Sequence, residues 1–198
     1  LENGVSGDTL YCADMARGAK SVLDLGCGTG LLASMILGPE RVVGVDPAAA
    51  MLGIARNRPG GDRVEWVLAD ARAVRLGERF DLITLTGHAF QCFLTDDDIK
   101  ACLATIASHL APGGTFIFDT RNPVVEEWRE WVPEHSRREL THPSFGSVGA
   151  WNDVAYDAAS DIATYRTVYE IAATGQTLSA DSRIRFIDRP ALSQLLDD

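Results

Sequence analysis

The chain has 198 residues, 46% of them hydrophobic, which suits one α/β domain with a sizeable core. Its formal net charge of -10 opposes sequence-independent binding to the phosphate backbone of nucleic acids, because such binding normally needs a face of Lys and Arg. We therefore expect a small-molecule substrate rather than DNA or RNA, although Arg137 and Arg138 leave room for a local basic patch.

The cysteines form no C-x-x-C pair and have no histidine at a spacing typical of zinc, so we expect reduced thiols and no metal. No apolar run approaches the roughly 20 residues needed to span a bilayer, and no signal peptide opens the chain. These features predict a soluble cytoplasmic protein with no membrane partner. They do not indicate an oligomeric state.

A short helix is expected over Thr9 to Gly18, and the stretch SVLDLGCGTGL follows it. This stretch starts as an apolar run too short for a helix and predicts a buried strand that meets a tight turn at Gly26, Gly28 and Gly30. Glycine permits positive φ and has no Cβ, so the turn forms a floor over which a ligand can pass closely. The next segment, LLASMIL, predicts a helix whose N-terminal amides point back at the turn.

Two residues here indicate the kind of ligand. The dinucleotide pattern G-x-G-x-x-G, counted from Gly26, needs its third glycine where the chain has Leu31. Asp24 precedes the glycines, and its carboxylate would repel a pyrophosphate but attract an ammonium or sulfonium group. The charge favours a cationic ligand.

The motif VLDLGCGTG resembles the first motif of the class I S-adenosylmethionine-dependent methyltransferases. The resemblance implies that the acid and the turn face the methionine end of S-adenosylmethionine; these residues are Asp24, Gly26, Cys27, Gly28 and Gly30. It also implies that the preceding helix contributes an aromatic side chain, here Tyr11, to the cofactor site. Glycines that serve only packing, and a tyrosine packed on the sheet edge, are the alternatives.

The run RVVGVD predicts a second strand that ends at Asp46, whose carboxylate can accept hydrogen bonds from both ribose hydroxyls of an adenosine. Pro47 and Met51, in the helical segment that follows, are assigned to the cofactor site with it. An N-cap role for Asp46, with Pro47 as the first helical residue, is a compatible alternative.

Val64 to Asp70 predicts a third strand. The resemblance implies that the Asp70 carboxylate accepts a hydrogen bond from the adenine amino group, and that the Ala71 amide donates to a ring nitrogen. Asp24, Asp46 and Asp70 come from three consecutive strands, and open α/β sheets bind ligands along the carboxyl edge.

The fourth strand is expected over Phe80 to Thr86. Thr86, Gly87 and His88 should lie beneath the methionine end of the cofactor, where the methyl group is presented. His88 is a candidate to take a proton from the acceptor or to position it, because the ordinary pKa of histidine lies near neutrality. Phe90 is assigned to the substrate side, with the helix core as the alternative.

Residues 95–110 predict a helix whose capping box begins at Thr95, so the aspartates of its first turn serve capping rather than metal binding. A fifth strand, GTFIFDTRNP, follows an APGG turn. Its D-x-R-N ending resembles the branch around glycine N-methyltransferase, which implies that Arg121 holds a substrate carboxylate. A salt bridge from this arginine to Asp119 or Glu126 is the alternative.

Residues 124–131 look helical, and residues 148–188 predict three closely spaced, hence antiparallel, strands. We expect these strands to form a lid over the open edge of the main sheet, with Trp151 facing the substrate; packing within the lid is the alternative. Residues 189–198 begin a helix, and the last two strands of the family's usual seven are absent from the chain.

The expected fold is therefore α/β, a Rossmann-like, doubly wound, mostly parallel sheet with a three-stranded antiparallel lid inserted after the fifth strand. One domain is expected over 1–198, with its core at about 9–131 and 189–198 and the lid at about 148–188.

The sequence predicts an enzyme that transfers a methyl group from S-adenosylmethionine to a small-molecule amine, carboxylate or hydroxyl. The sulfonium makes the methyl group electrophilic, so the enzyme mainly aligns the acceptor and excludes water. The alternatives are an NAD(P)-dependent oxidoreductase, which Leu31 and Asp24 disfavour, and a non-catalytic regulatory protein that binds S-adenosylmethionine.

Overall fold

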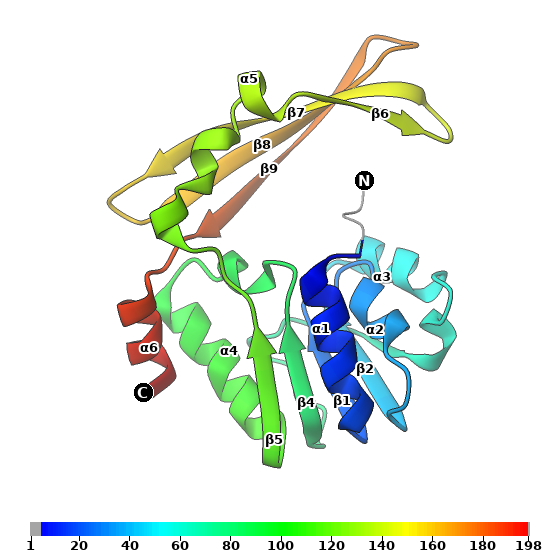
Figure 1. The fold of residues 1–198 in the computed structure, drawn as a ribbon, viewed down its shortest axis with the longest axis vertical. Helices are drawn as coiled ribbons and strands as arrows, with labels where there is room; N and C mark the ends of the chain where they lie inside the picture. The colour runs from blue at the N-terminus through cyan, green and yellow to red at the C-terminus, as the bar shows by residue number, and fades with distance from the viewer. Residues whose placement is uncertain (1–4, 198) are drawn as a thin grey trace. The chain divides into compact units, whose positions relative to one another are not determined.

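The computed structural model describes residues 5–197, which divide into two compact units. The first unit comprises residues 5–90 and 95–119, and the second comprises residues 91–94 and 120–197. Each unit contains one β-sheet (Figure 1).

The first unit is built on a five-stranded parallel sheet with the strand order β3-β2-β1-β4-β5, so the predicted Rossmann-like sheet is confirmed. The chain moves outward from β1 to β3 and then returns to the other side of β1. This reversal creates a topological switch point between β1 and β4, where open α/β sheets bind ligands. The elements are α1 (Gly7–Met15), η1 (Ala16–Gly18), β1 (Ser21–Leu25), α2 (Leu31–Met35), β2 (Arg41–Asp46), α3 (Ala49–Arg56), η2 (Gly61–Arg63), β3 (Glu65–Leu68), β4 (Phe80–Leu85), α4 (Asp96–His109) and β5 (Leu110–Phe118).

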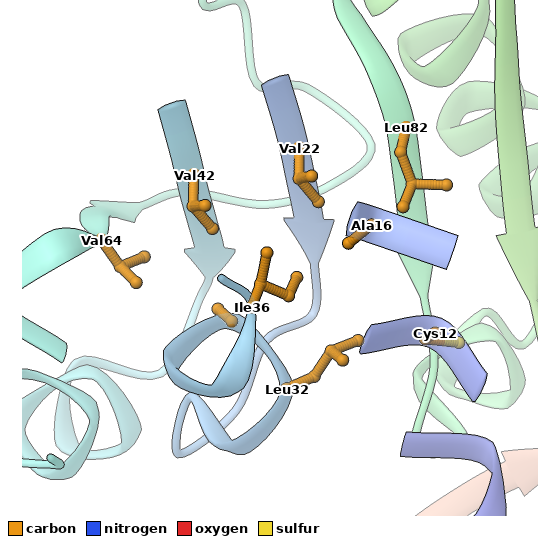
Figure 2. Packing of buried hydrophobic residues seen from close by; sticks show 9 residues of the cluster. Cys12, Ala16, Val22, Leu32, Ile36, Val42, Val64 and Leu82 are labelled. Carbon is orange, nitrogen blue, oxygen red and sulfur yellow. The ribbon is translucent and has the colours of Figure 1, made fainter. Parts of the chain in front are cut away.

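Both faces of this sheet are buried. On one face, apolar side chains from the helical segments pack against those of the strands (Figure 2); the labelled members are Cys12, Ala16, Val22, Leu32, Ile36, Val42, Val64 and Leu82. Leu23, Val43 and Ile83 are the next residues along three of the strands, so they point to the opposite face, and they are fully buried as well. Burial on both faces is typical of parallel sheets covered by helices.

The predicted cap of α4 is confirmed. Thr95 Oγ1 accepts a hydrogen bond from the Asp98 amide at 3.1 Å and donates one to the Asp98 carboxylate at 2.9 Å. The APGG segment, predicted as a turn before the fifth strand, instead lies within β5, which pairs irregularly with β4 at that point.

The second unit contains an antiparallel sheet of four strands in the order β6-β7-β8-β9, one strand more than predicted. The additional strand is RELTH, whose polar side chains give no apolar alternation and which becomes a strand by pairing with β7. The elements are η4 (Pro123–Val125), η5 (Glu127–Glu130), α5 (Pro133–Ser136), β6 (Arg138–His142), β7 (Gly146–Asp157), β8 (Ile162–Ile171), β9 (Gln176–Arg185) and α6 (Arg189–Asp197); η3 (Ala89–Cys92) spans the boundary between the units.

Residues 124–131 do not form the predicted helix. Glu126 has a φ of 52°, which divides the segment into the two short 3-10 helices η4 and η5. The Trp128 ring stacks on Tyr156 at 4.0 Å between centroids and meets the edge of Phe186 at 4.5 Å, so the aromatic residues here pack the unit's own core. Among residues 5–197, no helix is long and apolar enough to cross a membrane.

The packing of the sheet can be tested at Gly44 in β2. A Cβ at this position would lie only 2.5 and 2.7 Å from two carbons of the Trp66 ring. We predict that Gly44→Ala lowers the free energy of unfolding by about 1–3 kcal/mol, since the ring would have to move within a close-packed interior. Urea unfolding followed by circular dichroism measures the change.

The matched control is Gly53→Ala in α3, where an added Cβ would meet nothing within 4 Å. It is expected to raise the free energy of unfolding by roughly 0.5–1 kcal/mol, because alanine favours helix. Equal stability of the Gly44→Ala variant and the wild type would contradict the packing.

Candidate functional site

A pocket of about 720 Å³ lies in the first unit, outside the carboxyl ends of β1 and β4. Its walls come from the turn after β1, the segment after β4, the residue after β5 and the helices α1, α2 and α3. The pocket thus coincides with the topological switch point, and its size suits a nucleoside-sized ligand.

The three glycines of the turn have φ values of 65°, 55° and 75° at Gly26, Gly28 and Gly30, which explains why glycine stands at each. A Cβ on Gly26 would lie 2.7 Å from the Ala89 Cβ, and one on Gly30 would collide with the Trp66 ring. A Cβ on Gly28 would meet nothing within 4 Å, although Gly28 lines the pocket. Gly26 and Gly30 therefore serve the protein's own packing, and Gly28 leaves the pocket floor open.

Asp24 is buried at the centre of the site, with 2% of its surface exposed, and lines the pocket. Its Oδ1 accepts a hydrogen bond from Thr84 Oγ1 at 2.8 Å, across the pair of strands β1 and β4. Burial raises the pKa of this carboxyl to about 7, against the lowering effect of the Thr84 hydrogen bond. Burial likewise raises the pKa of the neighbouring Cys27 thiol, which also lines the pocket.

Asp46 lies at the end of β2, as predicted, and is buried. One carboxylate oxygen accepts from the Gly28 amide and the other from the Ala48 amide, each at 2.8 Å. The carboxylate therefore ties the glycine turn to the segment before α3. It does not belong to the pocket wall, and Pro47 beside it is exposed, whereas Met51 on α3 lines the pocket.

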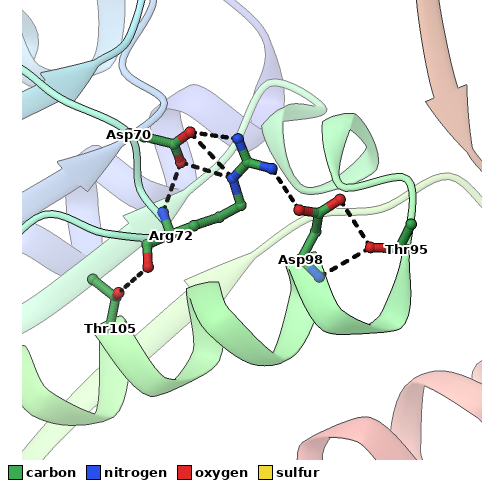
Figure 3. Close-up of polar contacts among 5 residues, drawn as sticks. All are labelled: Asp70, Arg72, Thr95, Asp98 and Thr105. Atoms are coloured by element: carbon green, nitrogen blue, oxygen red, sulfur yellow. Dashed lines mark hydrogen bonds and ion pairs between the residues drawn. The ribbon is translucent and has the colours of Figure 1, made fainter.

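Asp70 follows β3 and is held by Arg72 rather than lining the pocket (Figure 3). The Arg72 guanidinium donates to both Asp70 oxygens and also pairs with Asp98, which connects this loop to the cap of α4 at Thr95. The hydrogen bond from Arg72 lowers the pKa of the Asp70 carboxyl. Ala71 is buried next to it.

Thr86, Gly87 and His88 line the pocket together after β4. His88 has a φ of 69°, and its amide donates to Asp119 Oδ1 at 3.2 Å. The His88 Nδ1 lies 3.6 Å from the other Asp119 oxygen, so the carboxylate after β5 fixes the backbone of the histidine and faces its ring.

Two other predicted residues of this unit lie elsewhere. Phe90 is buried with its ring 4.9 Å from that of Phe118, so it belongs to the core and not to the pocket wall. Tyr11, on α1, is 59% exposed and lines a smaller neighbouring cavity instead.

Arg121 and Trp151 belong to the second unit. The Arg121 guanidinium pairs with Glu127 and lies over the Trp131 ring, 5.0 Å from its centroid. The Arg137 guanidinium lies over the Trp151 ring, 4.7 Å from the ring centroid.

The pocket also contains residues that the sequence did not single out. Asp119 and, on α1, Asp8 and Thr9 are among them. Asp119 directly follows a strand, so the same reasoning that selected Asp46 could have found it. Asp8 has no such signal, because only the tertiary fold brings α1 to the pocket.

Comparison with known proteins agrees with this arrangement. Residues 22–114 match a family model described as a methyltransferase domain. The chain is 32% identical over 160 residues to a ubiquinone biosynthesis O-methyltransferase of Pseudomonas putida, covering 72% of this chain and 66% of that protein. It is 35% identical over 117 residues to a dTDP-4-amino-2,3,4,6-tetradeoxy-D-glucose N,N-dimethyltransferase of Saccharopolyspora spinosa, covering 59% of this chain but only 43% of that protein.

The chain thus spans less than half the length of several curated relatives that it matches. Among solved structures, the CcbJ methyltransferase of Streptomyces caelestis superposes with a TM-score of 0.77 at 22% identity, over 98% of this chain and 84% of that one, and so supports the fold. The strand order, the glycine turn and the matched domain together identify the chain as a member of the class I S-adenosylmethionine-dependent methyltransferases.

Proposed function

We propose that the protein binds S-adenosylmethionine in the large pocket and transfers its methyl group to a small molecule. The observation that carries this proposal is the charge of the pocket wall. Asp8, Asp24 and Asp119 line it, and no Lys or Arg of residues 5–197 does. Such a wall favours a ligand that carries a sulfonium and an ammonium and disfavours one that carries phosphates.

The residues present fit this cofactor. Gly28 leaves room for a ligand to pass close to the backbone, and Asp24 offers a carboxylate beneath it. The bound cofactor would supply an electrophilic methyl group. A small-molecule acceptor is supported by relatives named as a cypemycin N-terminal methyltransferase, a dTDP-amino sugar N,N-dimethyltransferase and a ubiquinone biosynthesis O-methyltransferase. The net charge of -10, which opposes binding to nucleic acid, supports it as well.

Two adenosine contacts stay predictions. Both Asp46 oxygens already accept one backbone hydrogen bond, but a carboxylate has about four acceptor positions, so a ribose can still be accommodated. Asp70 already accepts four hydrogen bonds from Arg72, two on each oxygen, so an adenine amino group would have to displace one of them.

The binding test is calorimetry of the protein with S-adenosylhomocysteine and, in parallel, with NADH. We expect the first to bind and the second to give no heat, because the two phosphates of NADH would lie against a wall of carboxylates. Binding of NADH without binding of S-adenosylhomocysteine would establish the oxidoreductase alternative instead.

The raised pKa of Asp24 predicts how the free energy of unfolding depends on pH. Because burial raises its pKa in the folded protein to about 7, the folded state holds this proton more tightly than the unfolded chain does. The contribution of Asp24 to stability is therefore fully present below about pH 4 and is lost as pH rises through 7, by up to about 4 kcal/mol. Asp24→Asn should remove this loss.

The measurement is urea unfolding of the ligand-free wild type and Asp24→Asn at intervals from pH 4 to pH 8. The difference between the two free energies isolates Asp24 from the other carboxyl groups. A constant difference across this range would show that the buried carboxyl does not titrate there.

His88 is proposed to take the proton that the acceptor loses. Asn tolerates positive φ better than most residues, so His88→Asn tests the ring without disturbing the backbone. We expect kcat to fall about 100-fold or more, while the affinity for S-adenosylhomocysteine in calorimetry changes little. An unchanged kcat at saturating substrate would assign His88 to shape alone.

A further inference from the structure

A second cavity, of about 300 Å³, adjoins the cofactor pocket within the first unit. The two cavities share Asp8, Thr86 and Asp119 as wall residues. The rest of the smaller wall is largely apolar or aromatic and includes Tyr11 and Cys12 from α1 and Ile117 and Phe118 from β5. A methyl acceptor must lie beside the methyl donor, so a cavity with a common wall is the place for it.

We propose that this second cavity receives the methyl acceptor and that the acceptor is an amine, bound as its ammonium form beside Asp119 and Asp8 with an apolar portion against Tyr11, Ile117 and Phe118. The inference rests on the proposed function, because it assigns an acceptor to the methyl group that the larger pocket would present.

The first support is the charge of the shared wall. The Asp119 side chain is only 26% exposed; its Oδ1 accepts a hydrogen bond from the His88 amide, and its Oδ2 lies 3.6 Å from the His88 Nδ1. The Cys12 thiol, in the wall of the second cavity, is affected by the same negative charges. Its pKa is raised to about 11, first by burial and then by the charges of Asp24, Asp119 and Asp8.

The second support is the comparison of acceptor classes. A carboxylate acceptor would have to enter beside two carboxylates, which repel it. Arg121, which the sequence assigned to a substrate carboxylate, belongs to the second unit and pairs with Glu127 there. A hydroxyl would not be repelled, but an ammonium donates charge-assisted hydrogen bonds, which are about twice as strong as neutral ones.

The chemistry balances with the groups present. The bound ammonium has no lone pair, so it first gives one proton to the His88 imidazole, which has 40% of its side chain exposed and can pass the proton to water. The nitrogen lone pair then forms the bond to the methyl carbon. The carbon–sulfur bond breaks, its electron pair remains on sulfur, and the product nitrogen carries the positive charge.

The test measures binding, not turnover. Protein saturated with S-adenosylhomocysteine is titrated in ligand-observed NMR with benzylamine, benzyl alcohol and benzoate, three probes that share a ring and differ in the polar group. We expect benzylamine to bind at least about tenfold more tightly than benzoate. Asp119→Asn should weaken benzylamine about tenfold and leave benzyl alcohol nearly unchanged.

Asp62→Asn is the matched control, because it removes the same charge from an exposed position outside both cavities. It should leave the affinities for all three probes unchanged. Circular dichroism checks the fold of each variant, and Asp8→Asn replaces Asp119→Asn if the latter does not fold.

The outcomes separate the two proposals. If S-adenosylhomocysteine binds but benzoate binds as tightly as benzylamine, the amine assignment is overturned and the methyltransferase proposal stands. The same holds if benzylamine does not bind at millimolar concentration, or if the aspartate variants bind it like the wild type. If S-adenosylhomocysteine itself does not bind, both proposals fail.

Discussion

The hydrogen bond between Asp24 and Thr84 connects the fold of the first unit to its chemistry. It joins β1 to β4 at 2.8 Å, at the point where the strand order reverses. Burial raises the pKa of this carboxyl, because the hydrogen bonds from Thr84 and the Ala33 backbone compensate its ionised form only in part. A cationic ligand in the adjoining pocket would supply the missing charge, so the feature that destabilises the ligand-free site is the one that would select its ligand.

The three glycines of the turn after β1 have different surroundings. Gly26 and Gly30 have no room for a side chain because Ala89 and Trp66 occupy the space, whereas a Cβ on Gly28, which lines the pocket, would meet nothing within 4 Å. Packing and ligand binding were alternative explanations of this motif at the level of sequence. Packing accounts for Gly26 and Gly30, and ligand binding stays the prediction for Gly28.

The parallel sheet was predictable because each strand is a short apolar run closed by a glycine or an acid, and strand ends share one edge. The same reasoning located Asp24, Thr86, Gly87 and His88 on the pocket wall. It could not locate Asp8, which lies on a helix, nor β6, which is polar and depends on its partner strand. Phe90 was ambiguous because an aromatic residue after a strand suits a core as well as a pocket.

Trp66 carries a consequence for how this sequence can change over evolution. Its ring lies against both Gly30 and Gly44, and its Nε1 donates to the Gly61 carbonyl at 2.8 Å, which fixes the ring in place. Neither glycine can acquire a side chain while the indole stays, and a smaller residue in place of the indole would leave a void above both. Substitutions at Gly44 and Trp66 are therefore mutually dependent, and homologues that lose the tryptophan should be the ones in which Gly44 is free to vary. Gly30 stays restricted even then, by its φ of 75° and by the Ala55 Cβ, which would lie 2.8 Å from a Cβ at this position.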